Sequence, residues 1–124
     1  MRVARIRCVG LTVFWVLTCA GAAPSRAADP VGEPLQVLTA VVGDKNVFIP
    51  STLVLAAGPS AGISIFNATG KPHGFAIPAL GVEAVIPEQI EHHVDLPTLS
   101  PGLYRIHCQL HEAHRSASLL VVSE

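Results

Sequence analysis

Residues 35–124 of this 124-residue chain are predicted to form an all-β fold, either a sandwich or a barrel. Three observations support this prediction. Short runs rich in Val, Ile, Leu and Phe recur along the chain, and Gly, Pro or Asn residues separate them. Apolar residues recur at every second position in several of these runs, which is the period of a strand with one buried face. No segment of this part shows the sustained periodicity and end signals of a helix.

The first part of the chain is predicted to be an export signal and not part of the fold. Arg2, Arg5 and Arg7 precede an apolar run, and small residues up to Ala27 follow it. This order is typical of a secretory signal peptide, so we expect residues 1–27 to be removed. The apolar run is shorter than the roughly 20 residues of a membrane-spanning helix, which makes a retained anchor the weaker interpretation. A lipid-modified Cys19 is a second alternative.

The elements expected after the signal peptide follow one another at short intervals. Residues 28–34 contain two prolines and one glycine and are predicted to be a flexible lead-in to a domain over residues 35–124. The predicted strands cover residues 35–42, 47–57, 63–67, 73–77, 82–86, 90–96, 103–108 and 117–122.

Removal of the signal peptide changes the charge and the cysteine content. Four basic residues remain against nine acidic ones, a formal charge of −5, which argues against nucleic acid or anionic lipid as a partner. Cys8 and Cys19 are lost, so Cys108 is left alone and no disulfide within the chain can form. A single thiol in an oxidising compartment tends to oxidise unless it is buried or bound to metal.

The segment CQLHEAH places Cys108, His111 and His114 at intervals of three residues. A thiolate together with imidazoles is a donor set that suits copper or zinc. Taken alone, the segment leaves a second interpretation open, in which a buried thiol lies beside two surface imidazoles.

Strand alternation places two of the donors. In LYRIHC, Cys108 shares a face with Tyr104 and Ile106, and this apolar face is predicted to be the core. In HGFAI, His73 shares a face with two apolar residues in the same way. His73 and Cys108 are therefore expected to point inward at strand ends, whereas His107 is expected to face solvent. Two inward donors near a donor-rich loop favour a metal site over a packed thiol.

Two further residues are weaker candidates. His92 shares a face with Val94 by alternation and is expected at the edge of the core, with a role in or beside a metal site as the alternative. Glu112 lies between the histidines of the loop and is expected to be a solvated carboxylate, with a metal contact as the alternative.

The ordered set FIPSTLVLAAG, ISIFN, KPHGF and PGLYRIHCQLHEAH, followed by LLVV, resembles the cupredoxins, the group of plastocyanin and amicyanin. The resemblance covers roughly residues 36–122. It implies a Greek-key β-sandwich with one mononuclear copper at its rim. Carried over by position, it implies that His73, Cys108 and His111 bind the metal.

The chain departs from the family pattern at two positions. Short-loop members carry a methionine where this chain has His114, and no methionine follows Met1. Several relatives carry a side chain that hydrogen-bonds the cysteine sulfur where this chain has Gly74. Because an imidazole is a stronger donor than a thioether, His114 is expected to be the fourth ligand, to stabilise Cu(II) and to lower the reduction potential.

The expected function is transfer of one electron by a secreted copper protein, placed in a bacterial periplasm, between redox partners that the sequence does not identify. A copper carrier or buffer is the alternative, because His92, His93 and His114 would help to capture Cu(II). A closed, structural zinc site is a third option. No paired acid and base is apparent in the sequence, so we do not expect an enzyme.

Overall fold

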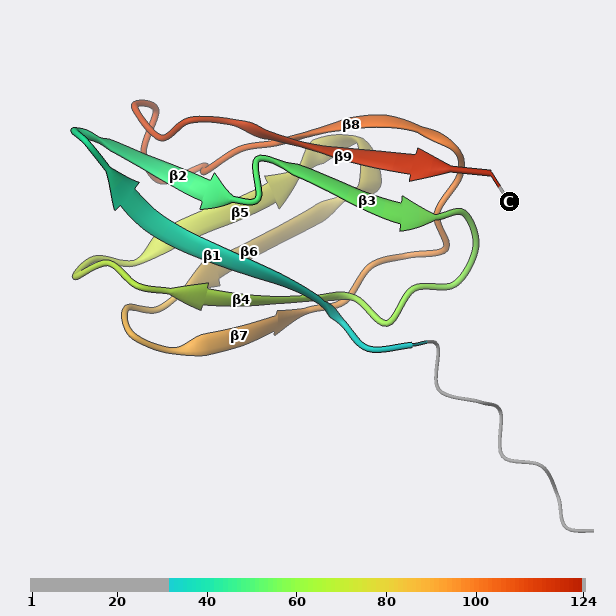
Figure 1. Cartoon of the computed structure of the whole chain (residues 1–124), viewed down its shortest axis with the longest axis horizontal. Coiled ribbons are helices and arrows are strands. Elements are labelled where there is room, and N and C mark those ends of the chain that lie inside the picture. Colours follow the sequence, from blue (N-terminus) through green and yellow to red (C-terminus); the bar gives the residue numbers. More distant parts are fainter. Residues whose placement is uncertain (1–31, 124) are drawn as a thin grey trace, which may run out of the picture.

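The computed structural model describes residues 32–123, so the predicted signal peptide, Cys19 and residues 28–31 lie outside the described part. Residues 32–123 contain no helix that could span a membrane. They form nine strands and one short 3-10 helix, shown in Figure 1: β1 (Leu35–Val42), β2 (Lys45–Ile49), β3 (Thr52–Ala56), β4 (Ile63–Asn67), β5 (His73–Ile77), η1 (Pro78–Leu80), β6 (Val82–Ile86), β7 (Glu91–Val94), β8 (Gly102–Ile106) and β9 (Ala117–Val122).

The strands form two mixed sheets and a hairpin. One sheet has the order β2-β1-β4-β7, the other has the order β3-β9-β8, and β5 pairs with β6. In Figure 1 the sheet of β3, β8 and β9 runs along the top of the view, and β4 and β7 run along the bottom. Two hydrogen bonds between Ala76 and His107 join β5 to the chain just beyond β8. The prediction of an all-β sandwich is confirmed.

The prediction of one strand over residues 47–57 is wrong. β2 ends at Ile49 and β3 begins at Thr52, and the two strands belong to different sheets. Pro50 lies at the break, and it has no amide proton to donate to a strand ladder. The apolar run therefore serves two sheets, and the chain crosses from one to the other between them, as Figure 1 shows.

The core lies between the two sheets and the β5–β6 hairpin. The rings of Phe48 and Phe75 meet edge to face, with their centroids 5.5 Å apart. Other fully buried apolar side chains include Ile65, Ile106 and Leu119. Burial of a side chain of this size stabilises a fold by about 1.5–3 kcal/mol. These contacts fix the ends of β5 and β8, from which two of the predicted metal donors come.

Strand β5 is buried along its whole length and not only on alternate residues. One face packs into the core through Phe75, and the other lies under the chain that continues from β8, where Gly74 and Ala76 are buried. His73 is 1% exposed, in agreement with the inward position expected from alternation.

Candidate metal centre

Three donor side chains from two distant segments converge at one end of the sandwich. His73 begins β5, Cys108 follows β8, and His111 lies in the loop between β8 and β9. One potential ligand atom from each lies within 4.8 Å of the other two. The sulfur of Cys108 is 3.9 Å from Nδ1 of His73 and 3.5 Å from Nδ1 of His111. A thiolate and two imidazole nitrogens in this arrangement could hold one copper or zinc ion.

The loop that carries the donors is tied to the sandwich at both ends. At its start, His107 exchanges two backbone hydrogen bonds with Ala76, at 2.9 and 3.0 Å. At its end, the amide of Arg115 donates to the carbonyl oxygen of Asn46 at 2.9 Å. Cys108 points inward beside Ile106, as strand alternation predicts, and is 5% exposed. The loop is therefore anchored to the sandwich by backbone bonds on both sides of its donors.

The sulfur of Cys108 receives a hydrogen bond from the backbone. The amide of Gly74 donates to it across a distance of 3.1 Å. From the sequence, Gly74 is a departure from the family pattern, because several relatives carry a side chain there that hydrogen-bonds the sulfur. The structure shows that the main chain supplies this hydrogen bond instead. A donor at this place stabilises the thiolate, the form of cysteine that binds metal.

His114 is buried beside the three donors, but it is not part of the group within 4.8 Å. Its ring packs on Phe48, with centroids 4.2 Å apart, and lies 5.1 Å from the ring of His73. Its Nδ1 is 2.9 Å from the carbonyl oxygen of Arg115. Because a carbonyl oxygen can only accept a hydrogen bond, Nδ1 carries the proton and Nε2 keeps a free lone pair.

The free nitrogen of His114 has no other use in the described structure. Nε2 is buried and has no hydrogen-bond partner. Buried polar atoms of folded proteins nearly always have a partner, so an orphaned lone pair next to His73 needs an explanation. A fourth ligand to an ion held at this end of the sandwich would provide one. The donor set therefore fits a metal on chemical and on structural grounds.

Burial keeps two of the imidazoles neutral. It is the main cause that lowers the pKa of His73 from 6.5 to about 4, and the neighbouring His114, His111 and Lys71 lower it further. Burial also lowers the pKa of His114, with a smaller contribution from His111, although the hydrogen bond to Arg115 acts in the opposite direction. Both rings are therefore neutral near pH 7, which is the form that binds metal.

Asn67 holds the segment that leads into His73. Its side chain is fully buried, and Nδ2 donates to the carbonyl oxygens of Lys71 and Ile86 at 2.8 and 3.1 Å. Its Oδ1 accepts from the amide and the hydroxyl of Thr69 at 3.0 and 2.7 Å. Sequence reasoning did not identify this role, although an Asn at the end of the run ISIFN, just before the turn that leads to His73, was a local signal for it.

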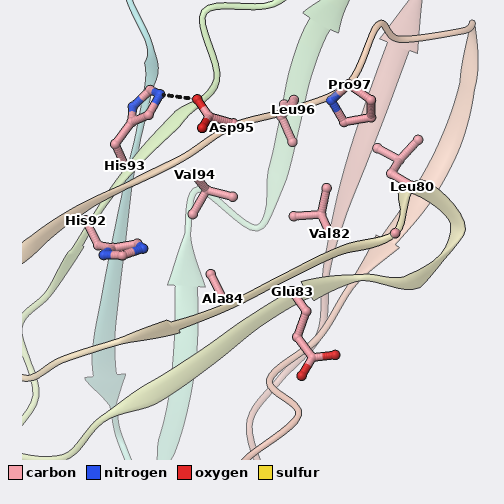
Figure 2. Close-up of a pocket in the computed structure, with 11 residues that line it drawn as sticks. Leu80, Val82, Glu83, Ala84, His92, His93, Val94, Asp95, Leu96 and Pro97 are labelled. Carbon is pink, nitrogen blue, oxygen red and sulfur yellow. Dashed lines mark ion pairs between the residues drawn. The ribbon is translucent and has the colours of Figure 1, made fainter.

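His92 and Glu112, the weaker candidates, lie outside the group of three donors. His92 lines a cavity of about 500 Å³ between β6 and β7, together with Val94 and Ala84. Figure 2 shows it on the side of β7 that faces Ala84. Glu112 is exposed on the loop, as expected. His107, which was expected to face solvent, is half-buried and is not part of the group of three donors.

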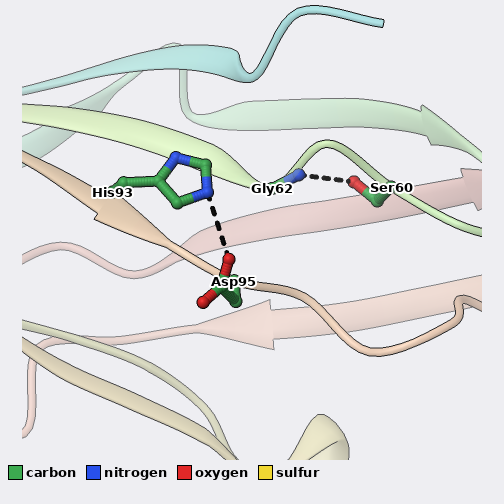
Figure 3. Close-up of polar contacts among 4 residues, drawn as sticks. All are labelled: Ser60, Gly62, His93 and Asp95. Atoms are coloured by element: carbon green, nitrogen blue, oxygen red, sulfur yellow. Dashed lines mark hydrogen bonds and ion pairs between the residues drawn. The ribbon is translucent and has the colours of Figure 1, made fainter. Parts of the chain in front are cut away.

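His93 also lies apart from the donors, near the edge of the sandwich. Its Nε2 is 3.2 Å from a carboxylate oxygen of Asp95; the side chain of His93 is about half exposed, and that of Asp95 is almost fully exposed. Figure 3 shows this pair beside Gly62, whose amide donates to the hydroxyl of Ser60 at 3.1 Å. A Cβ on Gly62 would lie 2.6 Å from the carbonyl oxygen of Val94, so only glycine fits here.

Comparison with solved structures places the fold. An oxidised variant of amicyanin superimposes with a TM-score of 0.53 at 17% identity, over 78% of this chain and 87% of that chain. A reduced Cu(I) form of another amicyanin variant gives a TM-score of 0.54 at 16% identity, over the same shares of the two chains. A purple cupredoxin from Nitrosopumilus maritimus gives 0.52 at 15% identity, over 71% of this chain and 99% of that one.

The sequence comparisons point to the same family. No curated protein matches the chain. Residues 9–121 match the family described as the cupredoxin-like domain, and this match covers most of the sequence. The predicted Greek-key sandwich of the cupredoxin type is therefore confirmed, and the chain belongs to the cupredoxin-like family.

Proposed function

We propose that this protein is exported to the periplasm and carries one electron on a single copper ion held by His73, Cys108, His111 and His114. The observation that carries the proposal is the group of one sulfur and two imidazole nitrogens within 4.8 Å at the end of a cupredoxin-like sandwich. Among the structural neighbours, an amicyanin variant is described in its Cu(I) form. Bound copper would supply the one-electron couple.

The residues of the chain have distinct parts in this function. His73 and Cys108 are buried and would shield the ion from water, whereas His111 is half-buried and lies nearest to the surface. An electron would therefore pass to a partner protein by way of His111. The anchored loop would hold the donors in nearly the same positions in both oxidation states, which keeps the reorganisation small.

His114 would set the character of the site. Its free Nε2 offers a stronger donor than the thioether of a methionine, so Cu(II) would be favoured and the potential lowered. We expect a green-to-red protein and not a blue one. One of the structural neighbours is itself described as purple, so the fold accommodates sites of other colours.

The experiment that tests the proposal is a titration of the purified, exported protein with Cu(II), followed by absorption spectroscopy. We expect one copper per chain and a band from charge transfer between thiolate and copper. Cys108→Ser should abolish the band, while His107→Ala should leave it unchanged. Stoichiometric binding without such a band, or an unchanged spectrum in Cys108→Ser, would exclude this donor set.

The role of His114 is tested separately by His114→Met. The substitution should shift the colour toward blue and raise the reduction potential. If spectrum and potential both stay the same, His114 does not contact the metal. The fourth donor would then be sought among a backbone carbonyl, Glu112 and His92.

A copper carrier is the second candidate. A cavity of about 350 Å³ beside the loop is lined by Cys108, His111 and His114 together with His107, and it offers a second chelator a way to the donors. Rapid loss of copper to a competing chelator, without reversible oxidation and reduction at an electrode, would favour this role. A closed zinc site would show no thiolate band with its native metal.

Export is tested by the mass of the protein recovered from the periplasm. We expect a chain that begins at Ala28. A retained N-terminus or a lipid on Cys19 would contradict the proposal of a released, soluble protein.

A further inference from the structure

Gln109, between Cys108 and His111, is half-buried, and its side-chain amide has no part in the proposed function. Its Nε2 donates to the carbonyl oxygen of Ala84 at 2.9 Å. Its Oε1 is buried and has no hydrogen-bond partner in the described structure. An unpartnered buried acceptor costs about 1–3 kcal/mol, so the hydrogen bond to Ala84 alone does not account for the position of the amide.

The amide of Gln109 lies against Gly74, on the side where an ordinary residue would carry its side chain. A Cβ built on Gly74 would overlap with Oε1 and Cδ of Gln109 and would lie 2.9 Å from its backbone nitrogen. Gly74 does not have the positive φ that Gly62 has, so space and not backbone conformation requires glycine here. The side chain of Gln109 thus fills the place of a missing side chain at position 74.

Gly74 and Gln109 are both neighbours of Cys108, one through a hydrogen bond and the other along the chain. Gly74 gives the sulfur its hydrogen bond, at 3.1 Å, and Gln109 is the next residue in the chain after Cys108. Through Ala84, Gln109 also ties the loop to β6, on the far side of β5. These two hydrogen bonds hold the loop against β5, next to the contact between the sulfur and the backbone amide of Gly74.

We propose that Gln109 is a positioning residue for Cys108, and that Gly74 and Gln109 form a matched pair in which glycine makes room for the amide. The proposal rests on the metal site proposed above. Here the loop supplies the packing and the backbone supplies the hydrogen bond.

The pair makes a specific prediction for single and double variants. Gly74→Ala should force Gln109 and its loop away and lengthen the hydrogen bond from the amide of residue 74 to the sulfur. Copper binding should weaken about 10- to 100-fold, as it typically does when a residue that orients a ligand is lost. Gln109→Ala should remove the amide that covers Gly74 and leave the space beside Gly74 empty. The double variant Gly74→Ala/Gln109→Ala should recover part of the affinity, because the clash with the side chain is gone while the backbone nitrogen remains close.

Two measurements on the metal-free protein keep this test independent of copper. In wild type, the amide of Gly74 should exchange slowly with solvent and Cys108 should react slowly with an alkylating reagent. Both rates should rise severalfold in Gly74→Ala and in Gln109→Ala, and they should fall back in the double variant relative to Gly74→Ala. These rates report on the pair even if the metal turns out not to be copper.

Gly70→Ala is the matched control, because a Cβ on Gly70 would meet nothing within 4 Å. It should behave as wild type in every measurement. The proposal is overturned if Gly74→Ala matches Gly70→Ala, or if the double variant is as impaired as the two single effects combined. Failure of both Gly74→Ala and the double variant to fold would also overturn it, since removal of the amide would then not relieve the clash.

Discussion

Replacement of Asn67 should destabilise the loop before His73 without changing any of the metal donors. Both protons on Nδ2 are donated, to the carbonyl oxygens of Lys71 and Ile86, and Oδ1 accepts from Thr69. Asn67→Ala leaves these groups without partners in a site that is fully buried. Each orphaned group costs about 1–3 kcal/mol, but water can reach those nearest the surface. We therefore expect the free energy of unfolding to fall by about 2–4 kcal/mol.

Asn67→Asp provides a sharper version of the same test, because it keeps the shape and loses only the donors. A carboxylate would face the two carbonyl oxygens that now accept hydrogen bonds, so this variant should be no more stable than Asn67→Ala despite its closer fit. Urea unfolding of the metal-free protein measures both losses. Asn46→Ala is the control, since the backbone and not the side chain of Asn46 makes the contact with Arg115.

The reasoning fails if Asn67→Ala lies within about 0.5 kcal/mol of wild type, the range of ordinary surface substitutions. It also fails if Asn67→Asp is clearly the more stable of the two variants, because the donated hydrogen bonds would then contribute little.

Three more predictions concern the surroundings of the site. Phe48→Ala should cost about 3–5 kcal/mol and also change the spectrum of the copper-loaded protein, since the ring packs on both Phe75 and His114. The fold lowers the pKa of His73 from 6.5 to about 4, so the unfolded chain binds the proton more tightly than the folded chain does. The free energy of unfolding of the metal-free protein should therefore be constant above pH 6.5 as far as His73 is concerned. It should decrease by up to about 3 kcal/mol as the pH falls toward 4. His73→Gln should lose that part of the pH dependence in urea unfolding, and an unchanged profile would contradict it. His93→Ala removes a half-exposed ring beside Gly62 and its pair with Asp95, so stability should change by less than about 1 kcal/mol and the copper spectrum should not change.

Strand alternation correctly predicted burial where one face of a strand is covered and the other is not. Cys108 and Ile106 lie two residues apart on one strand and its extension, and both are buried as the pattern predicts. The same rule is less informative for β5, where Gly74 and Ala76 are buried as well as His73. Alternation predicts burial on one face of a strand, whereas both faces of β5 are covered.

The division of residues 47–57 into two strands depends on partners far away in the sequence. β2 pairs with the adjacent β1, whereas β3 pairs with β9 at the end of the chain. An apolar run carries no mark of the sheet to which each half belongs. Pro50 was a local signal that the run could break, but the crossing between sheets follows from the long-range pairing.

The donors could be predicted from the sequence, but not the contacts that orient them. Cys108 and His111 share one motif, whereas the bond from Gly74 to the sulfur spans 34 residues. The fit between Gly74 and Gln109 is a matter of volume, and the sequence shows only a glycine and a glutamine. The proton of His114 is likewise fixed by a carbonyl oxygen, a group that every residue carries.

These orienting contacts bear on the choice between an electron carrier and a copper carrier. The loop is fixed by bonds from His107 to Ala76 and from Arg115 to Asn46, and the approach to His73 is fixed by Asn67. All are bonds within the protein and need no ion to form. A site that gives up its metal to a partner benefits from a loop that can open, because each ligand must leave in turn. Donors anchored on both sides, by backbone bonds and by a buried amide, instead favour a geometry that changes little, which is what rapid transfer of an electron requires.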